Sequence, residues 1–221
     1  MSRTIHVAAS SLVFMAAAGV GLLAHNGGPI PPASPEVLAT KAFNSGVKHL
    51  DNGDRSELKA ASEKGGKIAK ALQRSRDEYE KALKDFKTAV DLLPSMYRAF
   101  NGLGYAYRKT GDYARALENY DQALKLSPDF ADAIEYRGEA DLGLNRTEDA
   151  KQAYLKLFAS DRVHADMLMK AMKAWVEQRH ADPAGVDPSA LTAFEGWIGE
   201  RADLARRTIN MAQESPQASW R

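Results

Sequence analysis

Along most of the chain, apolar side chains recur every three or four positions, which is the spacing of one face of an α-helix. Between Ala165 and His180 the positions i, i+3, i+4, i+7 and i+8 are apolar, and they are Leu168, Ala171, Met172, Trp175 and Val176. Another stripe recurs every seven residues, through Leu72, Tyr79, Phe86 and Leu93. It predicts a helix that begins near Gly66 and is about twice the usual length. The pattern therefore predicts an all-α protein.

The first segment has a different pattern. Residues 7–24 carry no charge, they follow Arg3, and no acidic residue occurs before Glu36, which is the order of a secretory signal. These 18 apolar residues also reach the lower limit for spanning a bilayer. Residues 1–26 are therefore either a cleaved signal peptide or an N-terminal membrane anchor, and a mitochondrial presequence is disfavoured because one Arg is too few. Residues 27–38 are rich in Pro and Gly and are expected to form a linker.

Either outcome predicts export. The positive end stays in the cytosol, so the folded part would be periplasmic, or anchored to the inner membrane by the N-terminus with its domain outside the cytoplasm.

The most specific pattern lies in residues 97–130. Its first half has large residues at Phe100, Leu103 and Tyr107 and a small one at Gly104. Its second half has small residues at Ala116 and Ala123, a large one at Tyr120 and a helix-ending proline at Pro128. This segment resembles a tetratricopeptide repeat, a unit of 34 residues that forms two antiparallel helices. Gly104 and Ala116 let the two helices approach closely, and Pro128 ends the second helix because proline cannot continue it.

Two further copies flank this segment. Residues 131–164 repeat it with Gly138, Ala150, Tyr154 and Leu157 at matching places. Upstream, residues 79–96 match a second helix, and residues 39–54 match a first helix with Gly46 at the close-packing position and a turn at Gly53 and Asp54. The first repeat is therefore predicted to be interrupted by a helical insertion over residues 55–78.

The resemblance implies a right-handed α-solenoid of three tetratricopeptide helix pairs over residues 39–164. Residues 165–213 are expected to form C-terminal capping helices, the second opened by Asp187 as N-cap and Pro188 at the first helical position. Residues 214–221 are expected to be a flexible tail.

Composition removes several classes of function. The 30 basic and 29 acidic residues nearly balance, so no net field favours nucleic acid as a partner. Without cysteine there is no disulfide, thiolate metal site or thiol nucleophile, and the five histidines show no metal-ligand spacing, so we expect no metal and no cofactor. An enzyme built around His164, Asp166, His180 and Asp182 is disfavoured because no nucleophile or phosphate loop lies nearby. We therefore predict no catalytic site.

In proteins with this repeat, the first helices of successive pairs line a concave groove. Carrying those positions over predicts partner-binding residues at Phe43, Val47, Arg98, Asn101, Tyr105, Arg108, Lys109, Asp132, Glu135 and Glu139. This surface runs from apolar through basic to acidic, which favours an extended or helical peptide of mixed charge. The convex side is the alternative binding face. A carboxylate clamp of the kind seen in chaperone-binding relatives is disfavoured, because Phe43, Val47, Asp132 and Tyr136 occupy its places.

The insertion has seven basic and four acidic residues. Lys64, Lys67, Lys70 and Arg74 could contact an anionic membrane surface, although a solvated helix face is the favoured interpretation because Asp77, Glu78 and Glu80 follow.

Taken together, the sequence predicts a non-enzymatic scaffold that binds a protein or peptide partner in its groove during assembly of a cell-envelope complex. The alternatives are a structural accessory subunit built stably into a membrane-associated complex and, less favoured, an enzyme-associated sensing domain.

Overall fold

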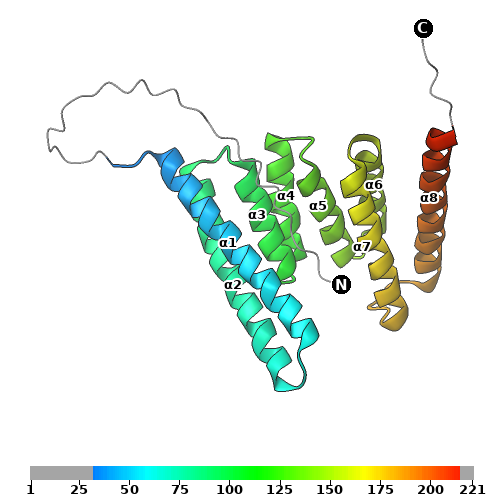
Figure 1. Ribbon diagram of the computed structural model, residues 1–221, viewed down its shortest axis with the longest axis horizontal. Helices are drawn as coiled ribbons and strands as arrows, with labels where there is room; N and C mark the ends of the chain where they lie inside the picture. Colours follow the sequence, from blue (N-terminus) through cyan, green and yellow to red (C-terminus); the bar gives the residue numbers. More distant parts are fainter. Residues whose placement is uncertain (1–31, 215–221) are drawn as a thin grey trace, which may run out of the picture. The chain divides into compact units, whose positions relative to one another are not determined.

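The computed structural model describes residues 32–214, in which the chain forms eight α-helices and no strand (Figure 1). The helices pack in pairs, so the predicted all-α class of fold is confirmed. The chain divides into two compact units, Met1–Ser95 (unit 1) and Met96–Arg221 (unit 2). Within residues 32–214 no helix is both long enough and apolar enough to cross a bilayer. The predicted signal or anchor segment and most of the predicted tail lie outside the described residues.

Unit 1 contains a hairpin of two long antiparallel helices, α1 (Pro35–Ser62) and α2 (Gly66–Leu92) (Figure 1). Helix α1 begins inside the segment predicted to be linker, because Ser34 accepts a hydrogen bond from the Val37 amide at 3.4 Å and Pro35 suits the first helical position. The chain reverses at Gly65, whose φ of +61° favours glycine. Helix α2 then begins at Gly66, as the seven-residue stripe predicted.

Gly53 and Asp54 were predicted to form a turn, and this prediction is wrong, because α1 continues through both. The reason lies in what they contact on α2. A Cβ added at Gly53 would meet the Tyr79 ring at 2.5 Å, and the Tyr79 hydroxyl donates a hydrogen bond to Asp54 at 2.6 Å. Ser75 also donates to the Gly53 carbonyl at 2.9 Å. Both residues therefore hold the two helices together in mid-helix, and the turn forms only after Ser62.

The close-packing contact of the repeat occurs in both units. A Cβ at Gly104 would meet the Tyr120 ring at 2.5 Å, and one at Gly46 would meet the Phe86 ring at 2.8 Å. These partners are separated by 16 residues in unit 2 and by 40 in unit 1, a difference equal to the 24 residues of the predicted insertion. The α1–α2 hairpin is therefore a helix pair of the same design, lengthened at the end where its chain turns.

Unit 1 also contains a carboxylate with an unusually low pKa. Glu78 on α2 lies 2.5 Å from the Lys81 amine and 2.7 Å from Nδ1 of His49 on α1, and the Asn52 amide donates to it at 3.3 Å. These hydrogen bonds, the one from Lys81 foremost, favour the charged carboxylate and lower the pKa of Glu78 to about 2.

Unit 2 contains six helices. They are α3 (Tyr97–Lys109), α4 (Tyr113–Leu126), α5 (Ala131–Gly143), α6 (Thr147–Ser160), α7 (Arg162–Ala181) and α8 (Pro188–Glu214). The α3–α4 turn places Gly111 at φ +86°, and Asn145 takes the equivalent left-handed position in the α5–α6 turn at φ +59°. Asp161 accepts the His164 amide at 3.1 Å, so α7 begins three residues before the predicted capping boundary.

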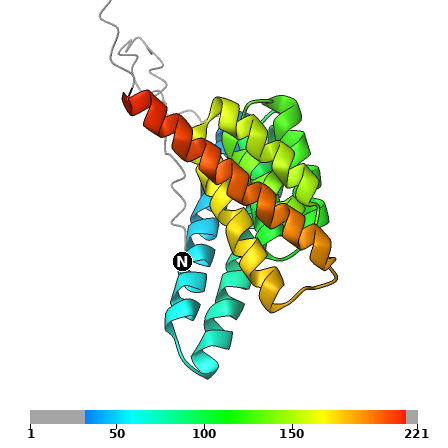
Figure 2. The same ribbon diagram turned by 90° about the vertical axis from the view of Figure 1, so that its right-hand side faces the viewer.

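The capping helices close the core of unit 2. Asp187 accepts the amides of Ser189 and Ala190 at 2.9 and 3.2 Å, so it caps α8 as predicted. Figure 2 shows α8 lying across α6 and α7. Its Phe194 meets Trp175 of α7 edge-on with ring centroids 5.5 Å apart, and its Trp197 meets Tyr154 of α6 in the same way. Aromatic packing therefore seals this end of unit 2.

Candidate functional site

The candidate site is the surface where α3 and α5, the first helices of two successive pairs, pack against each other. A nearly buried ion pair joins them: Arg108 Nη1 lies 2.5 Å from Glu139 Oε2, and the two side chains are only 15% and 13% exposed. Beside it, Tyr105 and Tyr136 meet edge-on with ring centroids 5.2 Å apart. We call these four residues the Arg108 cluster. It fixes the register of α3 against α5.

The Arg108 cluster keeps its charge. Burial disfavours a charged guanidinium, but Glu139 and the neighbouring tyrosines outweigh burial, so the pKa of Arg108 is raised well above its usual value. The guanidinium lies 4.9 Å from the Tyr105 ring centroid and 5.2 Å from that of Tyr136, within cation–π distance of both. Burial raises the pKa of the Tyr136 phenol as well as that of Tyr120. At neutral pH the cluster is therefore one Arg–Glu pair enclosed by neutral phenols.

The predicted partner-binding residues differ widely in accessibility. In unit 2 Tyr105 and Glu135 are buried, and Arg108 and Glu139 are joined to each other. The residues that remain exposed or half-buried on these two helices are Arg98, Asn101, Lys109 and Asp132. The surface available to a partner is therefore narrower than the sequence indicated.

The remaining two predicted residues, Phe43 and Val47, belong to α1 in unit 1, where both are half-buried. Phe43 packs on Phe86 with ring centroids 5.7 Å apart. Phe43 thus contributes to holding the hairpin together.

Asn101 has an unused acceptor. Its Oδ1 atom is buried and has no hydrogen-bond partner among residues 32–214. A buried acceptor without a partner is unfavourable. Because the Asn101 residue as a whole is only half-buried, a rotation of its side chain that exposes Oδ1 would let a backbone N–H of a bound peptide donate to it.

Helix α7 also packs against α5, and it brings His164 next to the residues of the candidate site. Nε2 of His164 lies 3.5 Å from Asp132 on α5, and its Nδ1 lies 2.9 Å from Asp161. The pKa of Asp161 is lowered, first by its hydrogen bond from the His164 amide and also by the imidazole. His164 therefore belongs to the surface beside Asp132.

Sequence reasoning named Tyr136 only as a residue in the place of a carboxylate clamp, and it missed His164 as part of this surface. Two of the contacts between α3 and α5, Tyr105 with Tyr136 and Arg108 with Glu139, join residues 31 positions apart. Equivalent positions in successive repeats are 34 residues apart, so a separation of 31 is shorter by about one helical turn. Searching for complementary residues 31 apart would have found the Arg108 cluster.

The residues considered for an enzyme do not form one constellation. His180 pairs with Glu195 of α8 at 3.1 Å, whereas His164 pairs with Asp132 and Asp161 at the start of α7. No group of His, Asp and Glu that could hold a metal ion occurs in the described part of the chain.

A second carboxylate of unit 2 has a displaced pKa. Asp141 of α5 is 1% exposed, and burial raises its pKa to about 6 although Arg137, whose Nη1 lies 3.2 Å from its carboxylate, acts in the opposite direction.

Comparison with known proteins supports the repeat. Residues 97–130 match the family described as "Tetratricopeptide repeat". Protein O-mannosyl-transferase TMTC3 of Mus musculus is 28% identical over 187 residues, covering 69% of this chain and 20% of the relative. Tetratricopeptide repeat protein 12 of Mus musculus is 26% identical over 167 residues, covering 68% and 23%. The Hsp70-Hsp90 organizing protein of Triticum aestivum is 27% identical over 139 residues, covering 60% and 24%. The chain thus spans less than a quarter of the length of each.

Proposed function

Because the chain carries a tetratricopeptide repeat at residues 97–130, we propose that it is a scaffold that binds a protein or peptide partner along α3, α5 and α7 of unit 2. The observation that carries this proposal is the Arg108 cluster. It aligns two first helices without using Arg98 or Asn101, and Asp132 stays partly accessible to a ligand beside His164.

The chemistry of these side chains specifies the ligand. Arg98 is exposed on α3, and Asp132 on α5 is partly accessible, so the surface presents one positive and one negative group. Asn101 Oδ1 offers an unused acceptor on the same helix as Arg98. A peptide that brings a backbone N–H to Asn101 and side chains of both charges to the other two positions fits this arrangement.

We also propose where in the cell the protein acts. The uncharged stretch at residues 7–24 supports export, with the protein periplasmic or anchored by its N-terminus, in the assembly of a cell-envelope complex. The name of one relative, Hsp70-Hsp90 organizing protein, describes action on other proteins, which agrees with a scaffold role. A right-handed solenoid of the helix pairs stays a prediction.

We further propose that the chain has no catalytic activity of its own. This is supported by the separate environments of His164 and His180, each paired with carboxylates of its own surroundings. Replacing His180, which pairs with Glu195 rather than with the candidate site, by Asn should leave the cellular role intact, and its loss would favour the enzyme alternative.

Photo-cross-linking in cells tests the scaffold. A photoreactive amino acid at Arg98 or at Asp132 should cross-link the same partner, whereas one at Gln122, exposed on α4, should not. Asn101→Ala should reduce both cross-links several-fold without changing thermal stability. A partner captured from Gln122 as efficiently as from Arg98 would move the binding surface to the second helices. Absence of any partner at the three positions would contradict the proposal.

A further inference from the structure

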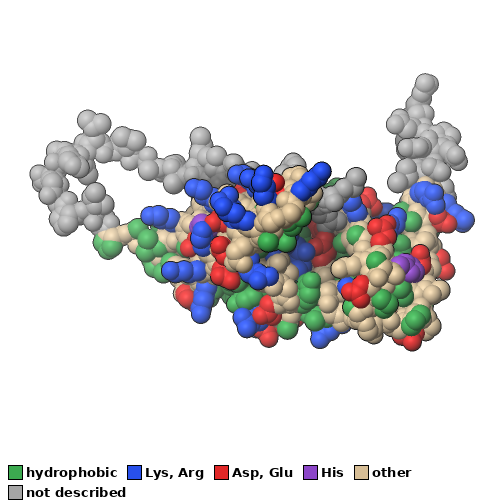
Figure 3. All heavy atoms as spheres, turned by 90° about the horizontal axis from the view of Figure 1, so that it is seen from below, with side chains coloured by type: hydrophobic (Ala, Val, Ile, Leu, Met, Phe, Trp, Pro, Cys, Tyr) green, Lys and Arg blue, Asp and Glu red, His purple; other side chains and the backbone are tan. Residues whose placement is uncertain are grey.

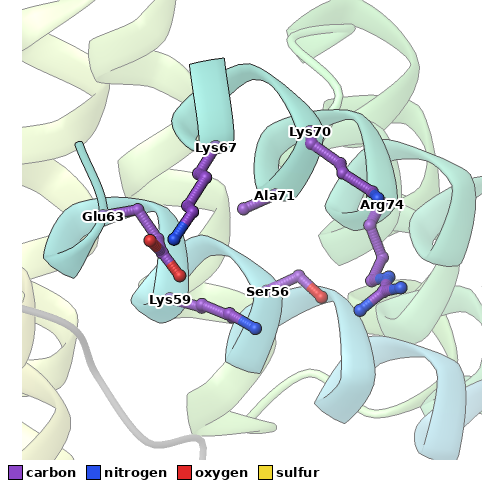
Figure 4. Close-up of a pocket in the computed structure, with 7 residues that line it drawn as sticks. All are labelled: Ser56, Lys59, Glu63, Lys67, Lys70, Ala71 and Arg74. Carbon is purple, nitrogen blue, oxygen red and sulfur yellow. The ribbon is translucent and has the colours of Figure 1, made fainter. Parts of the chain in front are cut away.

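The hairpin of unit 1 contains a pocket that the scaffold role does not use. It has a volume of about 320 Å³ and lies between α1 and α2 near the turn that joins them (Figure 4). Its lining residues come from both helices and the turn, and they are Ser56, Lys59, Glu63, Lys67, Lys70, Ala71 and Arg74. We call this site the basic pocket.

The basic pocket has a surplus of positive charge. Four of its lining side chains are cationic and only Glu63 is acidic. Figure 4 shows Lys67 and Glu63 extending toward one another, and Figure 3 shows Lys and Arg side chains gathered around this end of the hairpin. Among the described residues no carboxylate lies within 4 Å of a charged nitrogen of the four cations. By contrast, Lys81, which lies on α2 two turns beyond Arg74, is paired with Glu78 at 2.5 Å.

Helix α2 is arranged unfavourably for these cations. Lys67, Lys70 and Arg74 follow at i, i+3 and i+7, so neighbouring like charges repel along one face. Lys67 also lies in the first turn of α2, at the positive end of the helix dipole, and that turn has no acidic residue. A bound anion would relieve both effects.

We propose that the basic pocket binds a phosphate group. Arg74 offers a planar fork of N–H donors and Lys59, Lys67 and Lys70 offer ammonium groups, which are the side chains that recognise phosphate oxygens. The volume leaves room for a second phosphate or for the organic part of a phosphomonoester. All residues that line the basic pocket belong to residues 55–78, which lie outside the repeat pattern.

The geometry favours a phosphate compound in solution over a phospholipid headgroup. The exposed apolar side chains of α2 at this end are Ile68 and Leu72. On a helix of 3.6 residues per turn, Leu72 projects to nearly the opposite side from Lys70, and Ile68 lies about a quarter-turn from Lys67. A membrane would have to meet both faces at once.

Isothermal titration of the full chain with inorganic pyrophosphate tests the proposal. We expect wild-type protein to bind, Lys67→Gln/Lys70→Gln to bind at least ten-fold more weakly, and Glu63→Gln to bind several-fold more tightly because the one opposing charge is removed. The matched control is Lys84→Gln/Lys87→Gln, which removes two exposed cations from the same helix outside the pocket and should change nothing.

Three results would overturn the proposal. One is no binding of pyrophosphate by the wild-type chain at millimolar concentration. Another is equal weakening by the control pair, which would show a diffuse charge effect. The third is binding only to vesicles containing phosphatidylglycerol, with none to phosphatidylcholine vesicles or pyrophosphate, which would assign the pocket to a membrane surface. Circular dichroism of each variant shows that its helices are intact.

Discussion

The α1–α2 pair of unit 1 and the α3–α4 pair of unit 2 are both held by contacts between a glycine and an aromatic ring, but the two pairs differ in how often this contact occurs. In α3–α4 a glycine meets an aromatic ring once, at Gly104 and Tyr120. In α1–α2 the contact occurs twice, at Gly46 with Phe86 and at Gly53 with Tyr79, seven residues apart on each helix. Lengthening the pair therefore required no new kind of packing. The same layer was repeated two helical turns further along.

The two units also treat their charges differently. On the candidate site of unit 2, Arg108 is paired with Glu139 and enclosed by tyrosines. In the basic pocket of unit 1 the cations have no such partners within the described residues. The Arg108–Glu139 charges thus fix the position of two helices, whereas the cations of the basic pocket are available to a ligand.

The largest effect is expected from breaking the buried pair of unit 2. Arg108→Met would remove the guanidinium 2.5 Å from the nearly buried Glu139, and removing one member of a buried pair typically destabilises by about 3–5 kcal/mol. Arg74→Met in the basic pocket should change the free energy of unfolding by less than about 0.5 kcal/mol. Urea unfolding measures both. The double variant Arg108→Met/Glu139→Leu should recover most of the loss, and failure to recover would show that Arg108 acts through packing instead.

The next effect tests the glycine contacts. Gly104→Ala and Gly53→Ala each place a methyl group at 2.5 Å from a buried tyrosine ring, and such overpacking destabilises by about 1–3 kcal/mol. Gly66→Ala is the control, since nothing lies within 4 Å of its added Cβ and the change favours the helix. Thermal unfolding should rank both tyrosine-facing variants well below the control. If Gly53→Ala were neutral, the second layer of the hairpin would not be a packing layer.

Glu78 makes the stability of unit 1 depend on pH. Its folded pKa of about 2 lies below the usual value of 4.5, so its stabilising contribution is present above pH 4.5 and is lost as the pH falls from 4.5 toward 2. Glu78→Gln should therefore destabilise by about 1.5 kcal/mol at pH 7, the scale of a hydrogen bond to a charged group, and by much less at pH 2. An equal loss at both pH values would contradict this origin.

Asp141 makes the stability of unit 2 depend on pH in the opposite direction. Its folded pKa of about 6 lies above the usual 3.8, so the folded state binds the extra proton and stability falls as the pH rises through 6. Linkage predicts a loss of about 1 kcal/mol between pH 5 and pH 7 from this group. Asp141→Asn should remove that slope, measured as the difference in urea midpoint between the two pH values. An unchanged slope would show that another group is responsible.

The fold followed from the sequence wherever a residue type has one structural use. Gly104, Ala116 and Pro128 occur in a pattern that only a close-packed helix pair ended by proline explains, and Asp187 with Pro188 marks a helix start. Gly53 with Asp54 was misjudged because the same two residue types serve turns and close helix contacts equally well. The choice depends on Tyr79, 26 residues downstream of Gly53, which no local pattern includes.

The candidate site was less predictable for a related reason. Position within the repeat indicates which side chains point toward the groove, and it identified Arg108 and Glu139. It does not indicate that they meet each other, because that depends on how far α5 is displaced along α3. The displacement of about one helical turn follows from two contacts in the structure, Arg108 with Glu139 and Tyr105 with Tyr136.

The layered hairpin has a consequence for how its length can change. Because its glycine–ring layers recur at seven residues on both helices, removing seven residues from each helix would bring the next layer into the place of the one lost. A deletion from one helix alone would set glycine against the wrong side chain. Natural or designed variants of this hairpin should therefore differ by about two helical turns in both helices at once. The length of the hairpin can change in this way while the remaining glycine–ring contacts between α1 and α2 are kept.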